Sequence, residues 1–435
     1  MKDSDVKFDV VVVGSGPSGV HAAYPLVKAG LRVAIIDGGL DRKRDATDKT
    51  YQLLKIKSNI EIIQSLAKGG LSELWPGICD YFTTLELIKI GLPADEILRE
   101  YKVITKLINL DLTPSLDIQG KSILDSQRNV YQLPQAFSYH TSSVIDDLKK
   151  FKNFTYLPNQ LVLKIKEKRE HAEIQSLSIN RSIESTTKTR FVILAAGSVN
   201  TTRILLRSFN LYNYKTPFLT KGNYMIVCLH TKTLMKKDKS KTGRHGQVAI
   251  ANNDFFVQFY KCNPLSLHKT LPYIPLPKTF ASFLFQAFAP HLVIADVRFP
   301  TFEGKGKFYR LKNGSDGDIL EISFHQTNSE LQNQKRKLKK IKKKLLSLGL
   351  VPLKTIMGDV TSHYANGVPN QDKPGILSTD SNGKLHQAKR IYIADASTWR
   401  MLPAKPPTLT IMANASRIGK NVLKKFKKRL DNRYA

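Results

Sequence analysis

The glycines near the N-terminus are the residues whose spacing points most directly to chemistry. Residues 13–19 read Val-Gly-Ser-Gly-Pro-Ser-Gly, which is the pattern G-x-G-x-x-G. In such a turn Gly14 permits the tight bend, Gly16 lets the backbone approach a pyrophosphate, and Gly19 lets the next helix pack closely on the strand. The phosphates would lie at the positive end of that helix. The segment therefore predicts a dinucleotide-binding site.

An acidic residue stands where this kind of site needs one. Asp37 ends the second apolar segment, 18 residues after Gly19. A carboxylate at this position accepts a hydrogen bond from a ribose hydroxyl and repels a 2′-phosphate, so NADP is disfavoured. The pattern does not distinguish FAD from NAD, and a purely structural glycine turn is the alternative. The fingerprint occurs once in the sequence, so a second domain that binds a nicotinamide nucleotide is not indicated. If the cofactor is a flavin, its reoxidation would then fall to oxygen, a quinone or a protein acceptor.

The elements around the turn have the order strand, glycine turn, helix, strand. Residues 10–13 are a short β-branched run typical of a parallel strand buried on both faces. Residues 20–28 carry a helical apolar face that ends at Ala29-Gly30, and residues 31–36 form the second strand.

Farther along the chain, helices and strands are predicted in separate blocks. Helices are expected over 85–110, 329–348 and 408–430. Strands are expected over 155–157, 161–165, 172–179, 191–195, 318–325 and 390–393, with 216–325 strand-rich as a whole.

The charge of the chain limits its partners. Its 435 residues include 68 Lys and Arg against 36 Asp and Glu, a net charge of +32. Such an excess favours nucleic acid, anionic lipid or phosphorylated substrates, and a merely solvated basic surface is the alternative. The three cysteines are scattered without metal-ligand spacing, so neither a disulfide framework nor a metal site is predicted. The weakly charged stretch 279–295 is too short to span a membrane and predicts a buried wall or a membrane-surface contact.

Four separated segments resemble the glucose–methanol–choline oxidoreductases, in the order in which that family carries them. The glycine turn is the first, and Lys68-Gly69-Gly70-Leu71-Ser72-Glu73-Leu74-Trp75 is similar to the family's "GGSSxxW" loop. Residues 191–203 resemble its "ILAAG" segment, and residues 391–413 resemble its "DAS…PTLTIMA" ending. The resemblance covers residues 10 to 420, and the middle regions 85–150 and 216–350 carry little motif, as in the family's variable substrate domain.

The resemblance implies FAD as the cofactor and assigns roles to individual residues. It implies that the ADP half is held by Gly14, Ser15, Gly16, Pro17, Ser18, Gly19 and Asp37, with Val162 against the adenine and Ala196 and Gly197 in the ILAAG segment. It implies that the flavin side and the ribityl–pyrophosphate region are lined by Gly69, Gly70, Ser72, Asp395, Ala396, Thr408 and Leu409.

The resemblance also implies a base. In the family a histidine before the last strand removes the alcohol proton while hydride moves to flavin N5, and His363 occupies that place. Imidazole suits this task because its pKa of about 6.5 lies near working pH. Tyr364, Asn366 and Lys405 are candidates for positioning the substrate.

Two departures from the family pattern bear on the reaction. Pro406 stands where members usually carry a His or Asn as the partner of the first histidine, and the H-x-x-G spacing is stretched to His363…Gly367. A dehydrogenase with an altered partner, a flavin reductase and a degenerate enzyme therefore remain open.

The resulting expectation is an α/β fold with a discontinuous, Rossmann-type FAD-binding domain formed by residues 1–84, 151–215 and 355–435. An α+β substrate or cap domain on an antiparallel sheet would comprise 85–150 and 216–354. The leading function is oxidation of an alcohol or sugar hydroxyl. The alternatives are a flavin-dependent reductase or isomerase acting on a lipid-linked or phosphorylated substrate at an anionic membrane, and a non-enzymatic nucleic-acid binder, which lacks any motif. The expected location is the cytoplasm, with the inner membrane face as a peripheral site.

Overall fold

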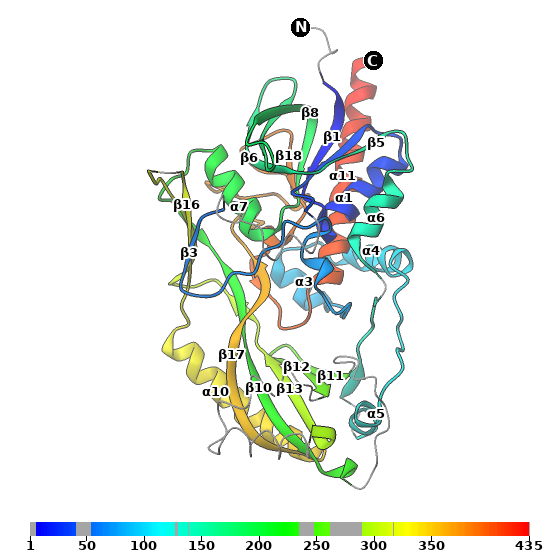
Figure 1. The fold of residues 1–435 in the computed structure, drawn as a ribbon, viewed down its shortest axis with the longest axis vertical. Coiled ribbons are helices and arrows are strands. Elements are labelled where there is room, and N and C mark those ends of the chain that lie inside the picture. Colours follow the sequence, from blue (N-terminus) through cyan, green and yellow to red (C-terminus); the bar gives the residue numbers. More distant parts are fainter. Residues whose placement is uncertain are drawn as a thin grey trace.

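The computed structural model describes residues 6–40, 54–126, 129–137, 139–234, 248–261, 289–315 and 317–434. Within these ranges the chain is a mixed α/β protein with four β-sheets (Figure 1). Most of the apolar stretch 279–295 and Cys262 lie outside the described residues. The described part of that stretch begins with a short 3₁₀ turn, η6 (Ala289–His291). Among the helices that are described, none has both the length and the apolar composition needed to cross a bilayer.

The glycine turn belongs to a seven-stranded sheet. Its parallel strands are, in sheet order, β5 (Phe154–Leu157), β2 (Val33–Ile36), β1 (Phe8–Val13), β8 (Glu184–Leu194) and β18 (Ile391–Ile393). An antiparallel extension of β8 adds β7 (Ala172–Ser178) and β6 (Gln160–Glu167). Every residue of β1 is buried, because helices or strands cover both faces of a parallel sheet. The predicted strands around the turn are confirmed.

Two different layers cover this sheet. On one face lie α1 (Pro17–Lys28), α6 (Thr141–Leu148) and α11 (Thr408–Tyr434). On the other lie α7 (Gly197–Ser208) and a four-stranded sheet, β3 (Ile56–Ser58), β16 (Ile319–Phe324), β15 (Lys307–Lys312) and β9 (Lys215–Pro217). Gly419 lets α11 approach α1 closely, since a Cβ there would lie 2.3 Å from the Ala22 carbonyl oxygen.

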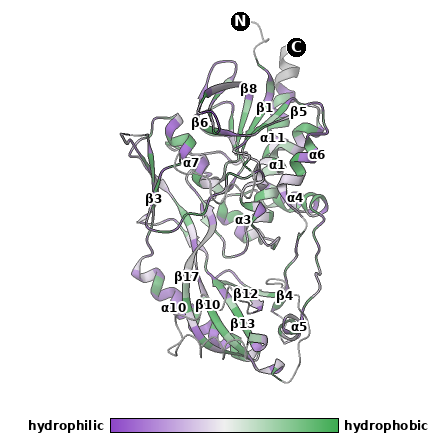
Figure 2. Ribbon diagram, in the orientation of Figure 1, coloured by the Kyte–Doolittle hydropathy of each residue, from purple (hydrophilic) through white to green (hydrophobic). Residues whose placement is uncertain are grey.

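A six-stranded antiparallel sheet extends away from the first one (Figure 1). Its order is β17 (Leu350–Ala365), β10 (Leu219–His230), β13 (Leu292–Arg298), β12 (Phe256–Lys261), β11 (Val248–Ala251) and β4 (Val130–Gln132). The basic helix α10 (Asn328–Ser347) packs on one face through Leu338, Ile341 and Leu345. In Figure 2 this helix is largely hydrophilic, whereas β13 in the sheet is largely hydrophobic. A two-stranded ribbon of β14 (Thr301–Phe302) and β19 (Met401–Leu402) completes the sheets.

Segment 85–150 is divided between the two large sheets. The predicted helix over 85–110 is two helices, α3 (Thr84–Ile90) and α4 (Ala94–Leu107), separated by Gly91 at a φ of 90° and by Pro93. Buried residues of α3, α4 and α11 share one cluster, so these two helices pack on α11, which covers the parallel sheet. The same cluster includes Leu219 and Ala365 from the ends of β10 and β17. In contrast, α5 (Ile118–Leu124) packs with residues of the antiparallel sheet.

Candidate functional site

One cavity, between the parallel sheet and β17, is lined by most of the residues that were predicted to bind the cofactor. They are Gly14, Ser15, Gly16, Pro17, Ser18, Asp37, Gly70, Ser72, Val162, Ala196, Gly197, Asp395, Ala396 and Thr408, and His363 and Tyr364 line the same cavity. Of the predicted residues that the structure describes, Gly19, Gly69, Leu409, Asn366 and Lys405 are not in its wall. The cavity therefore brings together segments that lie almost 400 residues apart in the chain.

The glycine turn has the conformation that its sequence predicts. Gly14 has a φ of 101°, and a Cβ there would lie 2.5 Å from the Ala195 carbonyl oxygen. A Cβ on Gly19 would lie 1.9 Å from the Gly14 carbonyl oxygen, so the helix could not approach the strand with any side chain at this position. At Gly16 the nearest atom to an added Cβ is the Gly69 oxygen at 3.8 Å. Gly16 thus leaves open space on the cavity side.

Three helices begin at the wall of the cavity. Gly16 is the N-cap of α1, Ala196 is the N-cap of α7, and α11 starts at Thr408. Neither Gly16 nor Ala196 has a side chain that caps its helix. Because backbone N–H groups at a helix N-terminus carry partial positive charge, this convergence favours a negatively charged ligand.

Asp37 lies at the carboxyl end of β2, with its carboxylate held by two neighbours. Its Oδ2 accepts hydrogen bonds from Ser15 Oγ at 2.5 Å and from Tyr156 Oη at 2.9 Å, and its Oδ1 accepts one from the Ser15 amide. Burial raises the pKa of Asp37, and these hydrogen bonds oppose that rise. The carboxylate is therefore fixed toward the glycine turn.

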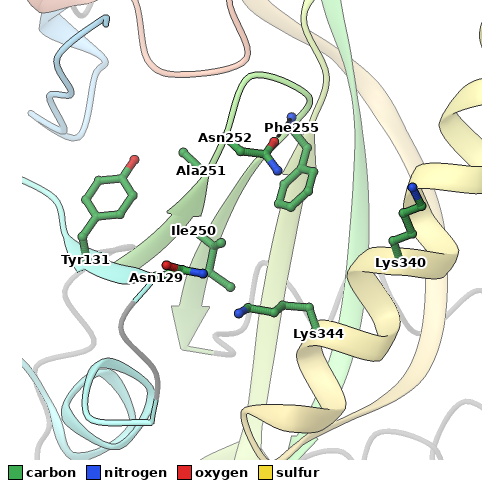
Figure 3. Close-up of a pocket in the computed structure, with 8 residues that line it drawn as sticks. All are labelled: Asn129, Tyr131, Ile250, Ala251, Asn252, Phe255, Lys340 and Lys344. Atoms are coloured by element: carbon green, nitrogen blue, oxygen red, sulfur yellow. Dashed lines mark hydrogen bonds between the residues drawn. The ribbon is translucent and has the colours of Figure 1, made fainter.

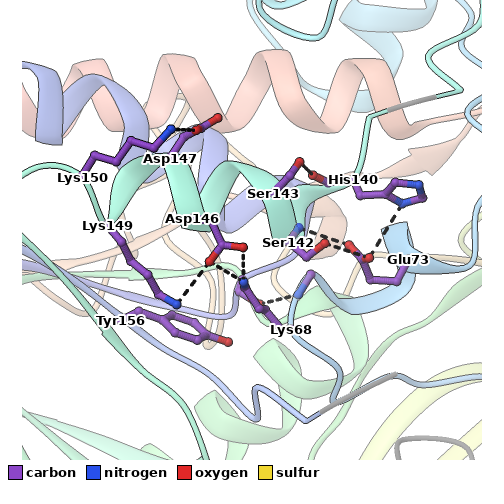
Figure 4. Close-up of polar contacts among 12 residues, drawn as sticks. Lys68, Glu73, His140, Ser142, Ser143, Asp146, Asp147, Lys149, Lys150 and Tyr156 are labelled. Atoms are coloured by element: carbon purple, nitrogen blue, oxygen red, sulfur yellow. Dashed lines mark hydrogen bonds and ion pairs between the residues drawn. The ribbon is translucent and has the colours of Figure 1, made fainter. Parts of the chain in front are cut away.

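The predicted loop 68–75 is pinned to the start of α6 (Figure 4). Glu73 accepts hydrogen bonds from the Ser142 amide and from Ser142 Oγ, the latter at 2.9 Å, and Lys68 pairs with Asp146 at 2.7 Å. The turn itself is η3 (Gly70–Glu73). A Cβ on Gly69 would lie 2.2 Å from Glu73 Oε1, so the glycine allows this folding back. The contacts hold Gly70 beside Gly16, where both line the cavity.

Asp395 has both a structural role and a place in the cavity. Its Oδ1 accepts from the Ser397 amide and caps the short turn η7 (Ala396–Thr398), while Oδ2 accepts from Thr201 Oγ1 at 2.5 Å. The bond to Thr201 ties the end of β18 to α7, and burial raises the pKa of Asp395. This carboxylate therefore joins two walls of the cavity.

His363 reaches the cavity from β17. The strand has an irregular register with β10 at this point, where the pairing passes from Thr220↔Tyr364 to Gly222↔Val360. Burial lowers the pKa of His363 well below its ordinary value, with further lowering from the positive charges of Lys221 and Arg298. The imidazole is therefore neutral at physiological pH, and its buried Nδ1 has no hydrogen-bond partner among the described residues.

The residues predicted to position a substrate are placed differently from one another. Tyr364 lines the cavity, and its Oη accepts a hydrogen bond from the Ile63 amide at 2.8 Å. Asn366 lies outside the cavity, where its Nδ2 donates to Glu303 Oε1 at 2.6 Å. Lys405 is also outside it, because its Nζ donates to the Tyr81 carbonyl oxygen at 2.9 Å and pairs with Glu86 at 3.3 Å.

Several lining or supporting residues were not predicted as part of the site, and three of them are polar residues that bear on the ligand. Asn200 and Arg203 line the cavity from α7, and their buried Oδ1 and Nε atoms have no partner in the part of the chain that the structure describes. Burial lowers the pKa of Arg203 to about 10, so its guanidinium remains charged at neutral pH. Tyr156, which donates to Asp37, lies on β5, the strand next to β2 in the sheet. The rule that ligands lie at the carboxyl ends of parallel strands was the available signal for Tyr156.

In the described part of the chain, no group of three or more His, Cys, Asp or Glu side chains is placed to hold a metal ion. Comparison with known protein families and with curated proteins finds no family model and no curated protein that matches the chain.

Proposed function

We propose that the chain is an FAD-dependent oxidoreductase of the glucose–methanol–choline type, with a Rossmann-type nucleotide fold around the glycine turn. One observation carries the proposal: the four segments that resemble this family, separated in sequence, contribute to the wall of a single cavity. A purely structural glycine turn gives no reason for Asp37, Val162, Asp395 and Thr408 to meet there.

The polar groups of the cavity wall and the room at Gly16 support binding of the ADP part of FAD. The uncapped N-termini of α1 and α7 offer backbone N–H groups to a pyrophosphate, and Gly16 leaves room for its close approach. Asp37 is in place to accept a ribose hydroxyl at the end of β2. Asn200 Oδ1 and Arg203 Nε, unpartnered within the described residues, add polar groups that a ligand would satisfy.

His363 is the residue proposed to handle the substrate proton. When bound, FAD would supply the acceptor for a hydride. As a neutral imidazole, His363 can take a proton from a substrate hydroxyl through the ring nitrogen that carries no proton. Pro406 offers no second side chain for this task, so His363 would act without the usual partner. Tyr364 lies beside it in the cavity wall.

The proposal predicts that the purified protein carries or takes up flavin and that substrate alcohols bleach its absorption. Under anaerobic conditions His363→Gln should slow bleaching about 100-fold while the flavin remains bound. Stopped-flow absorbance near ~450 nm, a property of the cofactor, measures both. The assignment of His363 would be wrong if the variant bleached as fast as the unmodified protein. The proposal as a whole fails if the protein neither contains nor binds flavin.

A further inference from the structure

Helix α10 is far more basic than its fold requires. Eight of the ten residues 335–344 are Lys or Arg. Its buried residues are Leu338, Ile341 and Leu345, and a capping box of Thr327 and Glu330 starts it. Like charges four residues apart, such as Lys339 and Lys343, destabilise a helix by a few tenths of a kcal/mol per pair. Packing and capping therefore stabilise the helix, and the repulsion between its like charges destabilises it.

The described residues neutralise little of this charge. Among the described residues, the ion pair that involves the basic run is Lys337 with Asp254 at 2.7 Å. The single acid of the helix, Glu330, is already paired with Lys307. The remaining cations of residues 335–344 thus form no ion pair with an acidic side chain in the part of the chain that is described.

Apolar side chains are exposed next to these cations. Leu346, in the last turn of α10, is 54% exposed, and Leu353 and Met357 on the adjoining strand β17 are 57% and 60% exposed. β17 is the outermost strand on its side of the sheet and α10 packs against it, so these exposed apolar side chains belong to the helix that carries the basic run and to the strand that contacts it. Lysines beside exposed aliphatic side chains are the combination that a bilayer surface accommodates.

An open groove under the helix adds a place for a phosphate group. Its volume is about 620 Å³, and Lys340 and Lys344 stand over it one helical turn apart. Figure 3 shows Lys344 reaching from α10 toward Ile250 and Asn129. The lining of this groove also includes the apolar side chains of Phe255, Ile250 and Ala251. The ammonium group of Lys344, which reaches into the groove, suits a phosphodiester, whose acyl part would follow the apolar side.

From these observations we infer that α10, with the adjoining β17, docks the protein on an anionic phospholipid bilayer. Nucleic acid fits the surface less well. The helix carries no aromatic side chain for stacking on bases, whereas its exposed leucine and the apolar residues of β17 have no use on a phosphate backbone. The inference is independent of the cavity chemistry, because none of these residues lines the cavity.

The test must separate this surface from the general positive charge of the chain. One variant changes Lys339, Lys340, Lys343 and Lys344 to Gln. Its matched control changes Lys424, Lys425, Lys427 and Lys428, which are exposed on α11 at the other end of the molecule, to Gln (Figure 1). Both variants lose four positive charges. Each is sedimented with vesicles of pure phosphatidylcholine and with vesicles that contain phosphatidylglycerol.

Binding to the phosphatidylglycerol vesicles should weaken about 100-fold in the α10 variant and much less in the α11 control. Binding of the unmodified protein to the vesicles should weaken as the salt concentration rises. A double variant, Leu346→Ser with Leu353→Ser, should reduce the binding that persists at high salt. Equal losses in the two lysine variants would overturn the inference, as would equal binding to both kinds of vesicle. It would also be overturned if the α10 variant lost affinity for duplex nucleic acid but kept its affinity for the vesicles.

Discussion

Replacing Gly19 with alanine is expected to lower the free energy of unfolding by more than about 4 kcal/mol. The added Cβ would lie 1.9 Å from the carbonyl oxygen and 2.8 Å from the carbonyl carbon of Gly14. Gly14 cannot yield, because its own amide donates to the Ile36 oxygen at 2.8 Å and its φ is 101°. The helix and the strand would have to separate, and the buried contacts of α1 would be lost with them.

Gly16→Ala is the matched control, since it adds the same methyl group three residues earlier. Its Cβ would lie 3.8 Å from the nearest atom, so its effect should stay within about 1 kcal/mol. Urea unfolding measures both variants, and failure of Gly19→Ala to yield folded protein counts as the expected result. Equal stability of the two variants would contradict the close packing of α1 on β1.

A second large effect is expected at Lys405, whose Nζ lies 3.3 Å from Glu86 in a buried ion pair. Lys405→Met should cost about 3 kcal/mol, because a buried carboxylate loses its cation and the Tyr81 carbonyl oxygen loses its donor. Asp80 is nearby and would be left with Glu86 as a like charge. The loss follows from the partners that remain buried, and not from a contact with substrate.

The cost of Lys405→Met should depend on pH in a defined direction. Burial raises the pKa of Asp80 to about 6, although Lys405 opposes that rise. A carboxyl with a raised pKa binds its proton more tightly in the folded state, so its contribution to the free energy of unfolding increases as pH falls from 6 toward 4. Without Lys405 the pKa of Asp80 rises further. The loss of unfolding free energy caused by Lys405→Met should therefore be smaller at pH 5 than at pH 7.

Two further variants make this second prediction specific. Lys150→Met removes a cation from the exposed pair with Asp147 and should produce no measurable change. Adding Glu86→Gln to Lys405→Met should recover part of the loss, because the unpaired charge is removed. Urea unfolding at pH 7 and at pH 5 gives the free energy of unfolding of the unmodified protein and of the three variants. A pH-independent loss, or none at all, would show that the Lys405 ammonium is not buried beside these carboxylates.

Local patterns were sufficient to predict the glycine turn and its neighbouring elements. The run of Val10 to Val13, the glycines and Asp37 each act over short distances, so their spacing alone defines β1, the start of α1 and the end of β2. The helix α10 was also predictable, because its apolar residues recur on one face and Gly349 ends it.

Contacts between distant segments could not be read in the same way. Lys405 and Asn366 stand close in sequence to motif residues, yet their partners, Glu86 and Glu303, come from other parts of the chain. Arg203 faces the cavity only because α7 lies across the sheet from the glycine turn. No spacing rule covers such pairings, since they depend on how whole elements pack.

The central claim is that the cavity beside the glycine turn binds FAD, and an equilibrium titration of the flavin-free protein tests it most directly. FAD should bind the unmodified protein, and Gly16→Val should weaken that binding about 100-fold, because its side chain enters the open space that Gly16 leaves beside the start of α1. Gly304→Val adds the same side chain outside the cavity and should bind FAD as the unmodified protein does. Loss of affinity in Gly16→Val alone, with both variants folded, is the predicted result. No binding to the unmodified protein, or equal binding by Gly16→Val, would contradict the account.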